Sequence, residues 1–261
     1  MTDPVFVQPL PEIPTVGDFV QLTGAEARHS EVKRIADGES VVVTDGATTA
    51  IRGVWQAGRI EIMELLDLPS PTPRVTIVQA LPKSDRAELA VDLSVQAGAD
   101  LIIPWAAQRS IARWDGKEHK AKARWEKTAF AAAKQSRRLV IPPIADLLRN
   151  LSDLPAVVRG QFGDRVGRVA IAVLHEDATD SFHDFLQSAQ QSLATDLVLV
   201  IGPEGGVSPQ ELERINDLAE SDSISTSTVV LGPEVLRTAT AGAVALGAVG
   251  VLTKRWNAAS R

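Results

Sequence analysis

Two short segments combine glycines with charged side chains at a spacing that suits ligand binding. The first is Gly202-Pro203-Glu204-Gly205-Gly206, and the second runs from Gly232 to Thr238 and contains Arg237. Glycines permit backbone conformations and close ligand approaches that a β-carbon forbids. Glu204 can act as a general base or simply cap neighbouring backbone amides, whereas Arg237 can stabilise an anion without being a base. These two residues are therefore the candidates for catalysis.

Several other kinds of site are disfavoured. Neither segment fits the dinucleotide fingerprint G-x-G-x-x-G or the P-loop pattern, so phosphate cradling is the weaker interpretation. The chain has no cysteine, which excludes disulfides, thiolate zinc sites and cysteine nucleophiles. Its four histidines show no metal-ligand spacing, so we expect no metal. Taken singly, each segment could still be an ordinary strand-to-helix turn.

The elements around the two segments place them at one edge of a sheet. Each segment follows a β-branched apolar run, Leu197–Ile201 for the first and Thr228–Leu231 for the second, and each leads into a helix. Ser208-Pro209 supplies a helix cap and a first-turn proline after the first segment. Ligands of open α/β sheets bind beyond the carboxyl ends of strands. The end of the run Val169–Leu174, with His175 after it, should form a third wall of the same pocket.

The wider pattern predicts two domains separated at the proline-rich stretch Asp67–Pro73. Short strands with turn signals predict a small β-barrel over residues 1–72, interrupted by one helix with Thr23 as N-cap and Glu26 completing a capping box. Strands alternate with helices over residues 73–261, which predicts an α/β domain with a mainly parallel sheet.

Basic side chains are concentrated in one stretch. The net charge is −6, yet residues 109–138 hold ten lysines and arginines against three acids. Trp114 and Trp125 interleave with these charges, as phosphate contact and base stacking would require, so RNA is the expected partner. The alternative is a helix face that is merely solvated. No run reaches the roughly 18 apolar residues of a membrane helix, and no signal peptide is evident, which favours a cytoplasmic protein without a membrane partner.

The motifs resemble those of the SPOUT RNA methyltransferases, and most closely the RsmE family. Five separated segments carry the resemblance in the family's order: Arg28-His29 with Val32, Arg34 and Gly38; Ala80–Arg86; Arg109-Ser110; Trp125 with Ala132–Arg138; and the two glycine segments. The chain departs from the family pattern at Gln96, Ala99 and Ala239. Because Ala239 stands where the family motif has a glutamate, no carboxylate at that position can act as the base here.

The resemblance implies a fold, a reaction and a set of site residues. It implies a SPOUT-type trefoil-knotted α/β domain behind a PUA-like barrel, and S-adenosylmethionine (SAM) as the cofactor. The reaction would be methylation of N3 of a uridine in 16S ribosomal RNA, uridine 1498 in the family, by a homodimer acting on the RNA or the assembled small subunit. The residues expected to bind SAM are Leu174, His175, Ile201, Gly202, Pro203, Glu204, Gly205, Gly206, Leu231, Gly232, Val235, Leu236, Arg237 and Thr238. Those expected to bind RNA are Arg28, His29, Arg34, Lys83, Arg86, Arg109, Lys134, Gln135, Arg137 and Arg138.

Two rival functions fit the same sequence. One is another SPOUT activity, on a ribose 2′-hydroxyl or on tRNA. The other is a non-catalytic RNA-binding protein of ribosome assembly that keeps the fold. The chemistry of the methylated nucleoside separates the first rival, and SAM binding separates the second.

Overall fold

The computed structural model describes residues 3–83 and 86–256. The chain forms two compact units: Met1–Ser70 with Phe130–Ile141, and Pro71–Ala129 with Pro142–Arg261. Below they are called the first and the second unit. Ser84 and Asp85, which belong to one of the motifs above, lie outside the described residues.

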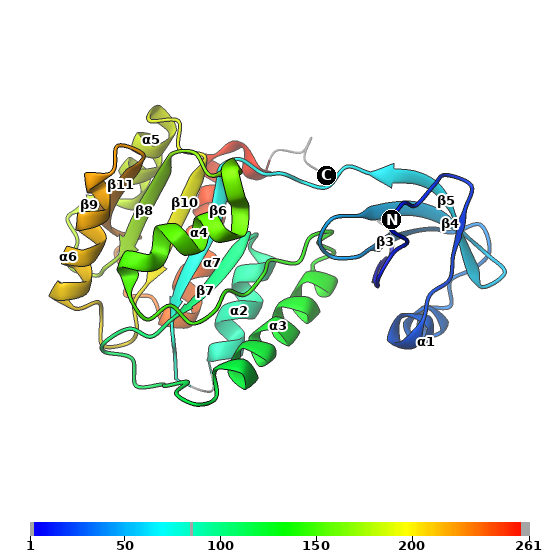
Figure 1. Cartoon of the computed structure of the whole chain (residues 1–261), viewed down its shortest axis with the longest axis horizontal. Coiled ribbons are helices and arrows are strands. Elements are labelled where there is room, and N and C mark those ends of the chain that lie inside the picture. Colours follow the sequence, from blue (N-terminus) through cyan, green and yellow to red (C-terminus); the bar gives the residue numbers. More distant parts are fainter. Residues whose placement is uncertain (1–2, 84–85, 257–261) are drawn as a thin grey trace. The chain divides into compact units, whose positions relative to one another are not determined.

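The first unit is built on a five-stranded sheet in the order β1-β3-β4-β5-β2 (Figure 1). Strand β1 pairs in parallel with β3, and the remaining pairs are antiparallel. Phe6, Ile51 and Ile60 belong to the buried cluster that the sheet covers. The strands are β1 (Val5–Val7), β2 (Phe19–Val20), β3 (Ser40–Thr44), β4 (Ala50–Gln56) and β5 (Arg59–Leu66).

Helix α1 (Gly24–Lys33) begins where the sequence predicts, but without the expected capping box. Thr23 occupies the N-cap position and its side chain makes no cap hydrogen bond. The capping-box prediction for Glu26 is wrong, because this carboxylate is buried and accepts a hydrogen bond from Lys134 instead. A capping box would need the Thr23 amide to donate to Glu26, but this amide donates to Oε1 of Gln8 over 3.0 Å.

Residues 130–141, which the sequence assigns to the second domain, belong to the first unit. The Thr44 hydroxyl donates to the Leu139 carbonyl over 2.7 Å, and the Ile141 amide donates to the Gly46 carbonyl over 2.8 Å. A β-carbon on Gly46 would lie 2.7 Å from Cδ1 of Ile141. The segment is therefore fastened closely to strand β3 and the turn after it.

The second unit contains a six-stranded, wholly parallel sheet in the order β7-β6-β10-β8-β11-β9. Its central strands β10 and β8 consist almost wholly of apolar residues, and most of these are buried, as expected for a sheet covered on both faces. The expected α/β class is thus confirmed. The strands are β6 (Arg74–Ala80), β7 (Leu101–Trp105), β8 (Val169–Leu174), β9 (Asp180–Ser181), β10 (Asp196–Ile201) and β11 (Ile224–Val230).

Helices cover the two faces of this sheet. Alternate strand residues such as Val78 and Val200 pack against α4 (Leu154–Phe162) and α6 (Pro209–Asp217), while Ile77 and Ile201 face Gly242 of α7. In Figure 1, α4 lies in front of the sheet and α7 behind it. The remaining helices are α2 (Ala87–Gln96), α3 (Glu118–Gln135), α5 (Phe182–Gln191) and α7 (Thr238–Leu252), with short 3-10 turns at Leu151–Asp153, Gly163–Arg165, Leu218–Glu220 and Lys254–Trp256.

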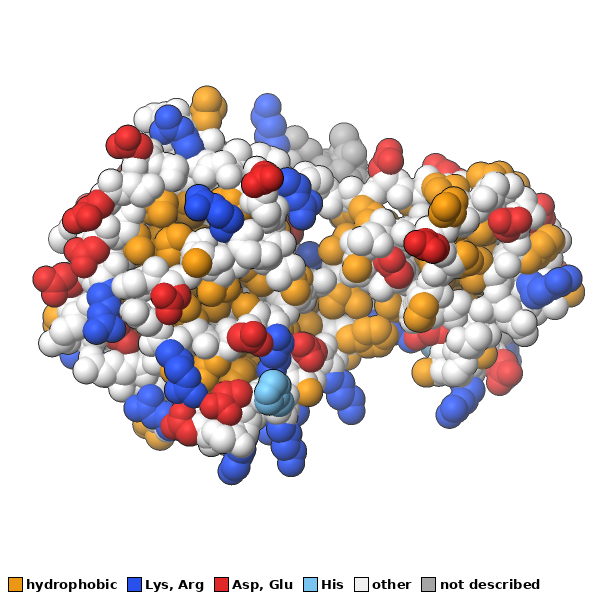
Figure 2. All heavy atoms as spheres, viewed as in Figure 1, with side chains coloured by type: hydrophobic (Ala, Val, Ile, Leu, Met, Phe, Trp, Pro, Cys, Tyr) orange, Lys and Arg blue, Asp and Glu red, His pale blue; other side chains and the backbone are white. Residues whose placement is uncertain are grey.

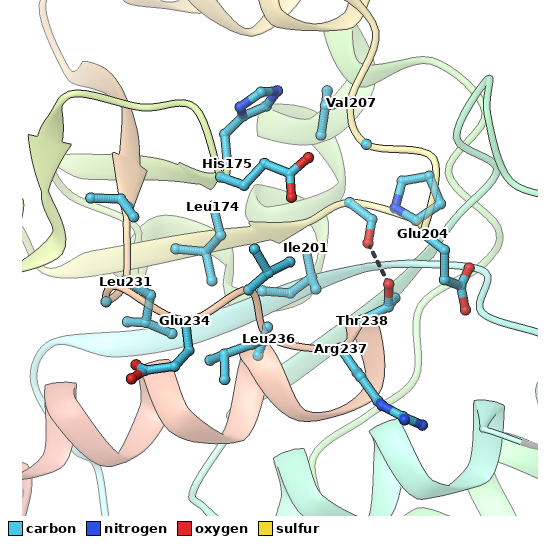
Figure 3. A pocket seen from close by; sticks show the side chains of 18 of the residues that line it. Leu174, His175, Ile201, Glu204, Val207, Leu231, Glu234, Leu236, Arg237 and Thr238 are labelled. Atoms are coloured by element: carbon cyan, nitrogen blue, oxygen red, sulfur yellow. Dashed lines mark hydrogen bonds between the residues drawn. The ribbon is translucent and has the colours of Figure 1, made fainter.

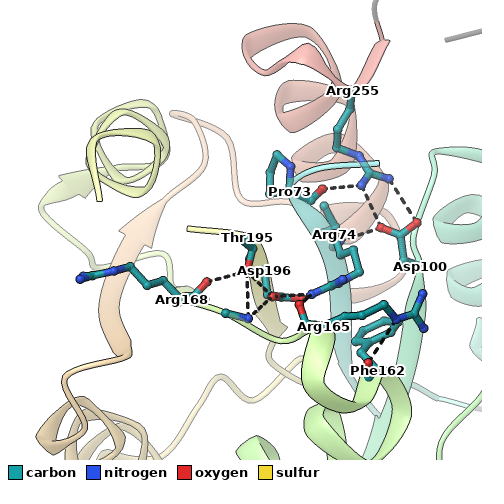
Figure 4. Close-up of polar contacts among 11 residues, drawn as sticks. Pro73, Arg74, Asp100, Phe162, Arg165, Arg168, Thr195, Asp196 and Arg255 are labelled. Carbon is teal, nitrogen blue, oxygen red and sulfur yellow. Dashed lines mark hydrogen bonds and ion pairs between the residues drawn. The ribbon is translucent and has the colours of Figure 1, made fainter. Parts of the chain in front are cut away.

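Buried ion pairs hold the amino ends of the strands (Figure 4). Nε of Arg74, the first residue of β6, donates to Oδ1 of Asp196, the first residue of β10, over 2.7 Å. Arg255 donates to Asp100 over 2.8 Å and to the Pro73 carbonyl over 2.5 Å. The contacts of Arg255 fix the turn after α7 at the sheet edge opposite the carboxyl ends of the strands.

The tryptophans of the basic stretch are not available for stacking on bases. Trp114 and Trp125 are only 8% and 2% exposed, and their rings pack edge to face with centroids 5.1 Å apart. The expectation that they stack on RNA is therefore wrong. The spacing of aromatic residues along the chain does not say whether their rings point inward or outward.

Much of the positive charge on α3 is also paired. Lys122 donates to Asp146 over 2.7 Å, a hydrogen bond that lowers the pKa of the aspartate, and Arg124 pairs with Glu88. Figure 2 shows blue and red side chains intermingled over the second unit. These pairs leave fewer lysines and arginines of α3 available to bind phosphates. Within the described ranges, no helix is both long and apolar enough to cross a bilayer.

Candidate functional site

A cavity of about 480 Å³ opens at the carboxyl ends of β8, β10 and β11. This is a normal size for a small-molecule site, and the edge of the sheet is the one predicted. The wall consists of Arg86, Leu174, His175, Glu176, Ile201, Gly202, Pro203, Glu204, Gly206, Val207, Val230, Leu231, Gly232, Pro233, Glu234, Val235, Leu236, Arg237, Thr238 and Ala241.

The first glycine segment turns sharply between β10 and α6. The Gly206 amide donates to the Pro203 carbonyl over 2.9 Å with φ at +74°, a conformation that favours glycine. A β-carbon on Gly202 would lie 2.9 Å from Cγ2 of Val207. The turn is thus compact because two of its residues have no side chain.

A capping box begins α6 and anchors this loop. The Ser208 hydroxyl accepts from the Glu211 amide, and the Glu211 carboxylate accepts from the Ser208 amide over 2.9 Å. The second carboxylate oxygen of Glu211 accepts from the Gln108 amide over 2.7 Å. The predicted cap at Ser208 is confirmed, and the buried Glu211 joins the loop after β7 to the loop after β10.

The second glycine segment crosses the pocket from β11 to α7. Buried Thr238 begins the helix, and its hydroxyl donates to the Gly202 carbonyl over 3.1 Å (Figure 3). Strand β8 provides the third wall, as predicted. There, the His175 amide donates to the Val229 carbonyl over 3.0 Å, and the Asp177 amide donates to Nδ1 of His175 over 3.2 Å.

The pocket has an apolar middle and charged edges. In Figure 3, Leu174, Ile201 and Leu236 converge on its centre, while the Glu204 carboxylate and the Arg237 guanidinium lie to one side. Across residues 3–83 and 86–256, no hydrogen bond or ion pair engages the guanidinium of Arg86 or Arg237. Such a wall suits a ligand with a flat apolar ring, hydroxyl groups and both signs of charge. Those are the chemical features of SAM.

Most of the residues predicted to bind a cofactor come together in this wall, with one exception. Gly205 is not part of it, because its α-carbon faces the loop after β7, where an added β-carbon would lie 3.2 Å from Cβ of Arg109. Sequence reasoning missed Val207, Val230, Pro233, Ala241 and two carboxylates, Glu176 and Glu234. Arg86 was predicted to bind RNA and was not predicted to line the cofactor pocket. The missed residues adjoin predicted ones, so widening each segment by one or two positions would have found most of them.

The residues predicted to bind RNA are divided between the two units. Arg28, His29, Arg34, Lys134, Gln135, Arg137 and Arg138 lie in the first unit, and Lys83, Arg86 and Arg109 lie in the second. His29 and Lys134 face Glu26, and Arg109 donates to the Gly205 carbonyl over 3.1 Å. Among the described residues, no three His, Asp or Glu side chains gather in a way that could hold a metal ion.

Comparison with known proteins agrees with this architecture. The model of the RNA methyltransferase domain family matches residues 68–250. A ribosomal RNA small subunit methyltransferase E from Mycobacterium bovis is 42% identical over 255 residues, covering 95% of this chain and 92% of the relative. This chain belongs to that family. The Bacillus subtilis member is 33% identical over 189 residues, which cover 69% of this chain and 67% of the Bacillus protein.

Solved structures share the fold of this chain. The small subunit methyltransferase E of Neisseria gonorrhoeae, bound to SAM, aligns with a TM-score of 0.71 at 26% identity, covering 96% of this chain and 98% of that one. A putative methyltransferase of Legionella pneumophila, in complex with SAM, has the same fold at a TM-score of 0.69 and 22% identity, covering 97% and 98%.

Proposed function

We propose that this protein transfers the methyl group of SAM to N3 of a uridine in the RNA of the small ribosomal subunit, uridine 1498 being the family's target. One observation carries the proposal. A pocket at the carboxyl ends of parallel strands is walled by two glycine loops, in a chain whose family includes a relative bound to SAM.

The two glycine loops and the end of β8 would hold the cofactor. Leu174, Ile201 and Leu236 supply apolar surface for the adenine, and the carboxylates of Glu176 and Glu234 can accept from ribose hydroxyls. When bound, SAM supplies an electrophilic methyl group on a sulfonium. The protein then has to orient the base and exclude competing nucleophiles, which needs no covalent enzyme intermediate.

Arg237 is the group that we assign to stabilising the uridine. N3 must lose its proton before or during attack, and a guanidinium aimed at the resulting anion lowers the barrier. Arg237 occupies the N-cap position of α7, where the helix dipole adds positive potential. Glu204 is the alternative, as the acceptor of the N3 proton.

The first unit is proposed as a PUA-like β-barrel that binds RNA, and the second as a SPOUT trefoil knot. The TM-score to the Neisseria relative, whose alignment covers 96% of this chain, supports both, and the strand order around β10 supports the second. A homodimer is proposed because α2 and α7 pack together and carry exposed apolar side chains, Leu89, Val244 and Val251. We place the enzyme in the cytoplasm, where its RNA is assembled.

Nucleoside analysis of ribosomal RNA tests the proposal directly. RNA from cells lacking this gene should have lost one N3-methyluridine, and the purified protein with SAM should restore it. A missing 2′-O-methylnucleoside, or a missing tRNA modification, would establish the first rival. Calorimetry that detects no SAM binding would establish the non-catalytic rival.

A further inference from the structure

A buried ion pair in the first unit joins two helices that are far apart in the sequence. Glu26 lies in the first turn of α1 with its side chain only 6% exposed, and its Oε1 accepts a hydrogen bond from Nζ of Lys134 over 2.5 Å. Lys134 lies in the last turn of α3, 108 residues further along. An unpaired buried carboxylate is costly, so the pair holds the end of α3 against α1.

His29 faces the other oxygen of the same carboxylate. Its Nδ1 lies 3.5 Å from Oε2 of Glu26, and its ring packs edge-on to Phe6 with centroids 5.5 Å apart. Neither Nδ1 nor Oε2 has a hydrogen-bond partner within the described chain. Glu26 is therefore the common neighbour of two residues that the motifs assign to RNA. The charge of Lys134 is already neutralised, so phosphates gain little from it.

The backbone of Lys134 in turn shapes the turn that carries two arginines. The Arg137 amide donates to the Lys134 carbonyl over 3.2 Å, and the Arg138 amide donates to the Ala133 carbonyl over 2.9 Å, which is a Schellman motif. Arg137 has φ at +58°, a left-handed conformation in which glycine is usual. An arginine at such a position points to a use for its side chain.

The far end of the same turn is also fixed. The Leu139 carbonyl accepts from the Thr44 hydroxyl, and the Ile141 amide donates to the Gly46 carbonyl. Residues 135–138 are thus held between two attachment points in one unit. Loss of the Glu26–Lys134 pair would remove the side-chain contact on the helix side and leave the strand side attached.

We propose that Glu26 is a positioning residue for RNA binding: it does not touch RNA, but it holds Lys134 and so presents Arg137 and Arg138 to the phosphates. This inference rests on the proposed function. The change in RNA affinity expected on removal of Glu26 is opposite to the one that simple electrostatics predicts. Removing an acid from a surface that binds phosphates should tighten binding, whereas removing a positioning acid should weaken it.

The test measures binding of the full-length protein to a 16S ribosomal RNA transcript at several salt concentrations. Glu26→Gln should raise the Kd about tenfold and leave SAM affinity unchanged. Lys134→Met should do the same without lowering the salt slope, because this lysine neutralises no phosphate. Lys134→Arg, which can keep the pair, should bind almost normally. Glu31→Gln, which removes an exposed acid from the same helix, is the matched control and should not weaken binding.

The double variant Glu26→Gln/Lys134→Met should be no weaker than either single variant, because both act through one contact. Because the double variant leaves no buried unpaired charge, its RNA affinity can still be measured if a single variant unfolds. Unweakened RNA binding by folded Glu26→Gln or by the double variant, or a salt slope lowered by Lys134→Met, would overturn the positioning role alone. A wild-type protein that binds no RNA would overturn the proposed function as well.

Discussion

The Thr238 hydroxyl donates a hydrogen bond to the Gly202 carbonyl across 3.1 Å, and through this bond the start of α7 holds the loop after β10. The two partners come from the two segments that sequence motifs single out. Buried Gln79 extends the contact, since its side-chain amide lies 3.5 Å from the Thr238 carbonyl. These hydrogen bonds therefore join β6, the end of β10 and the start of α7 beside the pocket.

Thr238→Val should weaken SAM binding roughly tenfold, because it leaves the Gly202 carbonyl without its donor and loosens both loops. Thr238→Ser keeps the hydroxyl and should bind almost normally. Calorimetry with SAM on both folded variants measures the difference. Equal affinities for the valine and serine variants would show that the hydrogen bond does not shape the site.

Gly202→Val should reduce SAM affinity more strongly than Gly205→Val. A side chain at Gly202 collides with Val207 in the pocket wall, whereas one at Gly205 meets Arg109 outside it. Circular dichroism establishes that both variants are folded, and SAM titration ranks them. If the Gly205 variant lost more affinity, the loop would have to present its other side to the cofactor.

Arg237→Ala should slow methyl transfer by on the order of a hundredfold, as loss of one aimed donor does in other enzymes, while SAM affinity changes little. Arg237→Lys should recover only part of the rate, because lysine keeps the charge but not the planar donor fork. Single-turnover rates at saturating SAM measure the chemical step. A near-normal rate for the alanine variant would move the role to Glu204.

Acid should weaken the first unit partly through Asp45. Burial raises the pKa of this carboxyl, but hydrogen bonds from the Thr49, Ala47 and Thr48 amides and the Thr48 hydroxyl outweigh it, so the pKa lies below its usual value of 3.8. A lowered pKa stabilises the folded state above the unfolded value and ceases to do so as pH falls through the folded value. Asp45→Ala should be less stable than wild type at pH 7, and the gap should narrow at an acid pH below the usual aspartate value of 3.8. Chemical unfolding at both pH values checks this. A gap independent of pH would mean that the charge of Asp45 is irrelevant.

The sequence correctly predicted elements whose formation depends mainly on the residues within them, such as apolar strands and helix caps. Val169–Leu174 and Leu101–Trp105 form strands with the predicted bounds, because β-branched and apolar runs suit a sheet buried on both faces. The cap at Ser208 formed as well. The loops between these elements place most of the predicted pocket residues correctly, since parallel strands bring their carboxyl ends to one edge.

Tertiary partners explain what the sequence could not predict. Glu26 and Glu211 both stand at capping-box positions, yet only Glu211 caps its helix, because Glu26 meets Lys134 from another part of the chain. The same applies to Trp114 and Trp125, whose pairing with each other is invisible in their spacing.

The membership of residues 130–141 in the first unit affects how the chain can fold during translation. Ribosomes add roughly 5–20 residues per second, so strand β3 and the turn after it wait on the order of ten seconds for Leu139 and Ile141 to emerge. No contiguous piece of the gene encodes this unit. A nascent chain halted before residue 130 should be digested by protease within residues 1–70, and one halted beyond the point where residue 141 leaves the ribosome should resist.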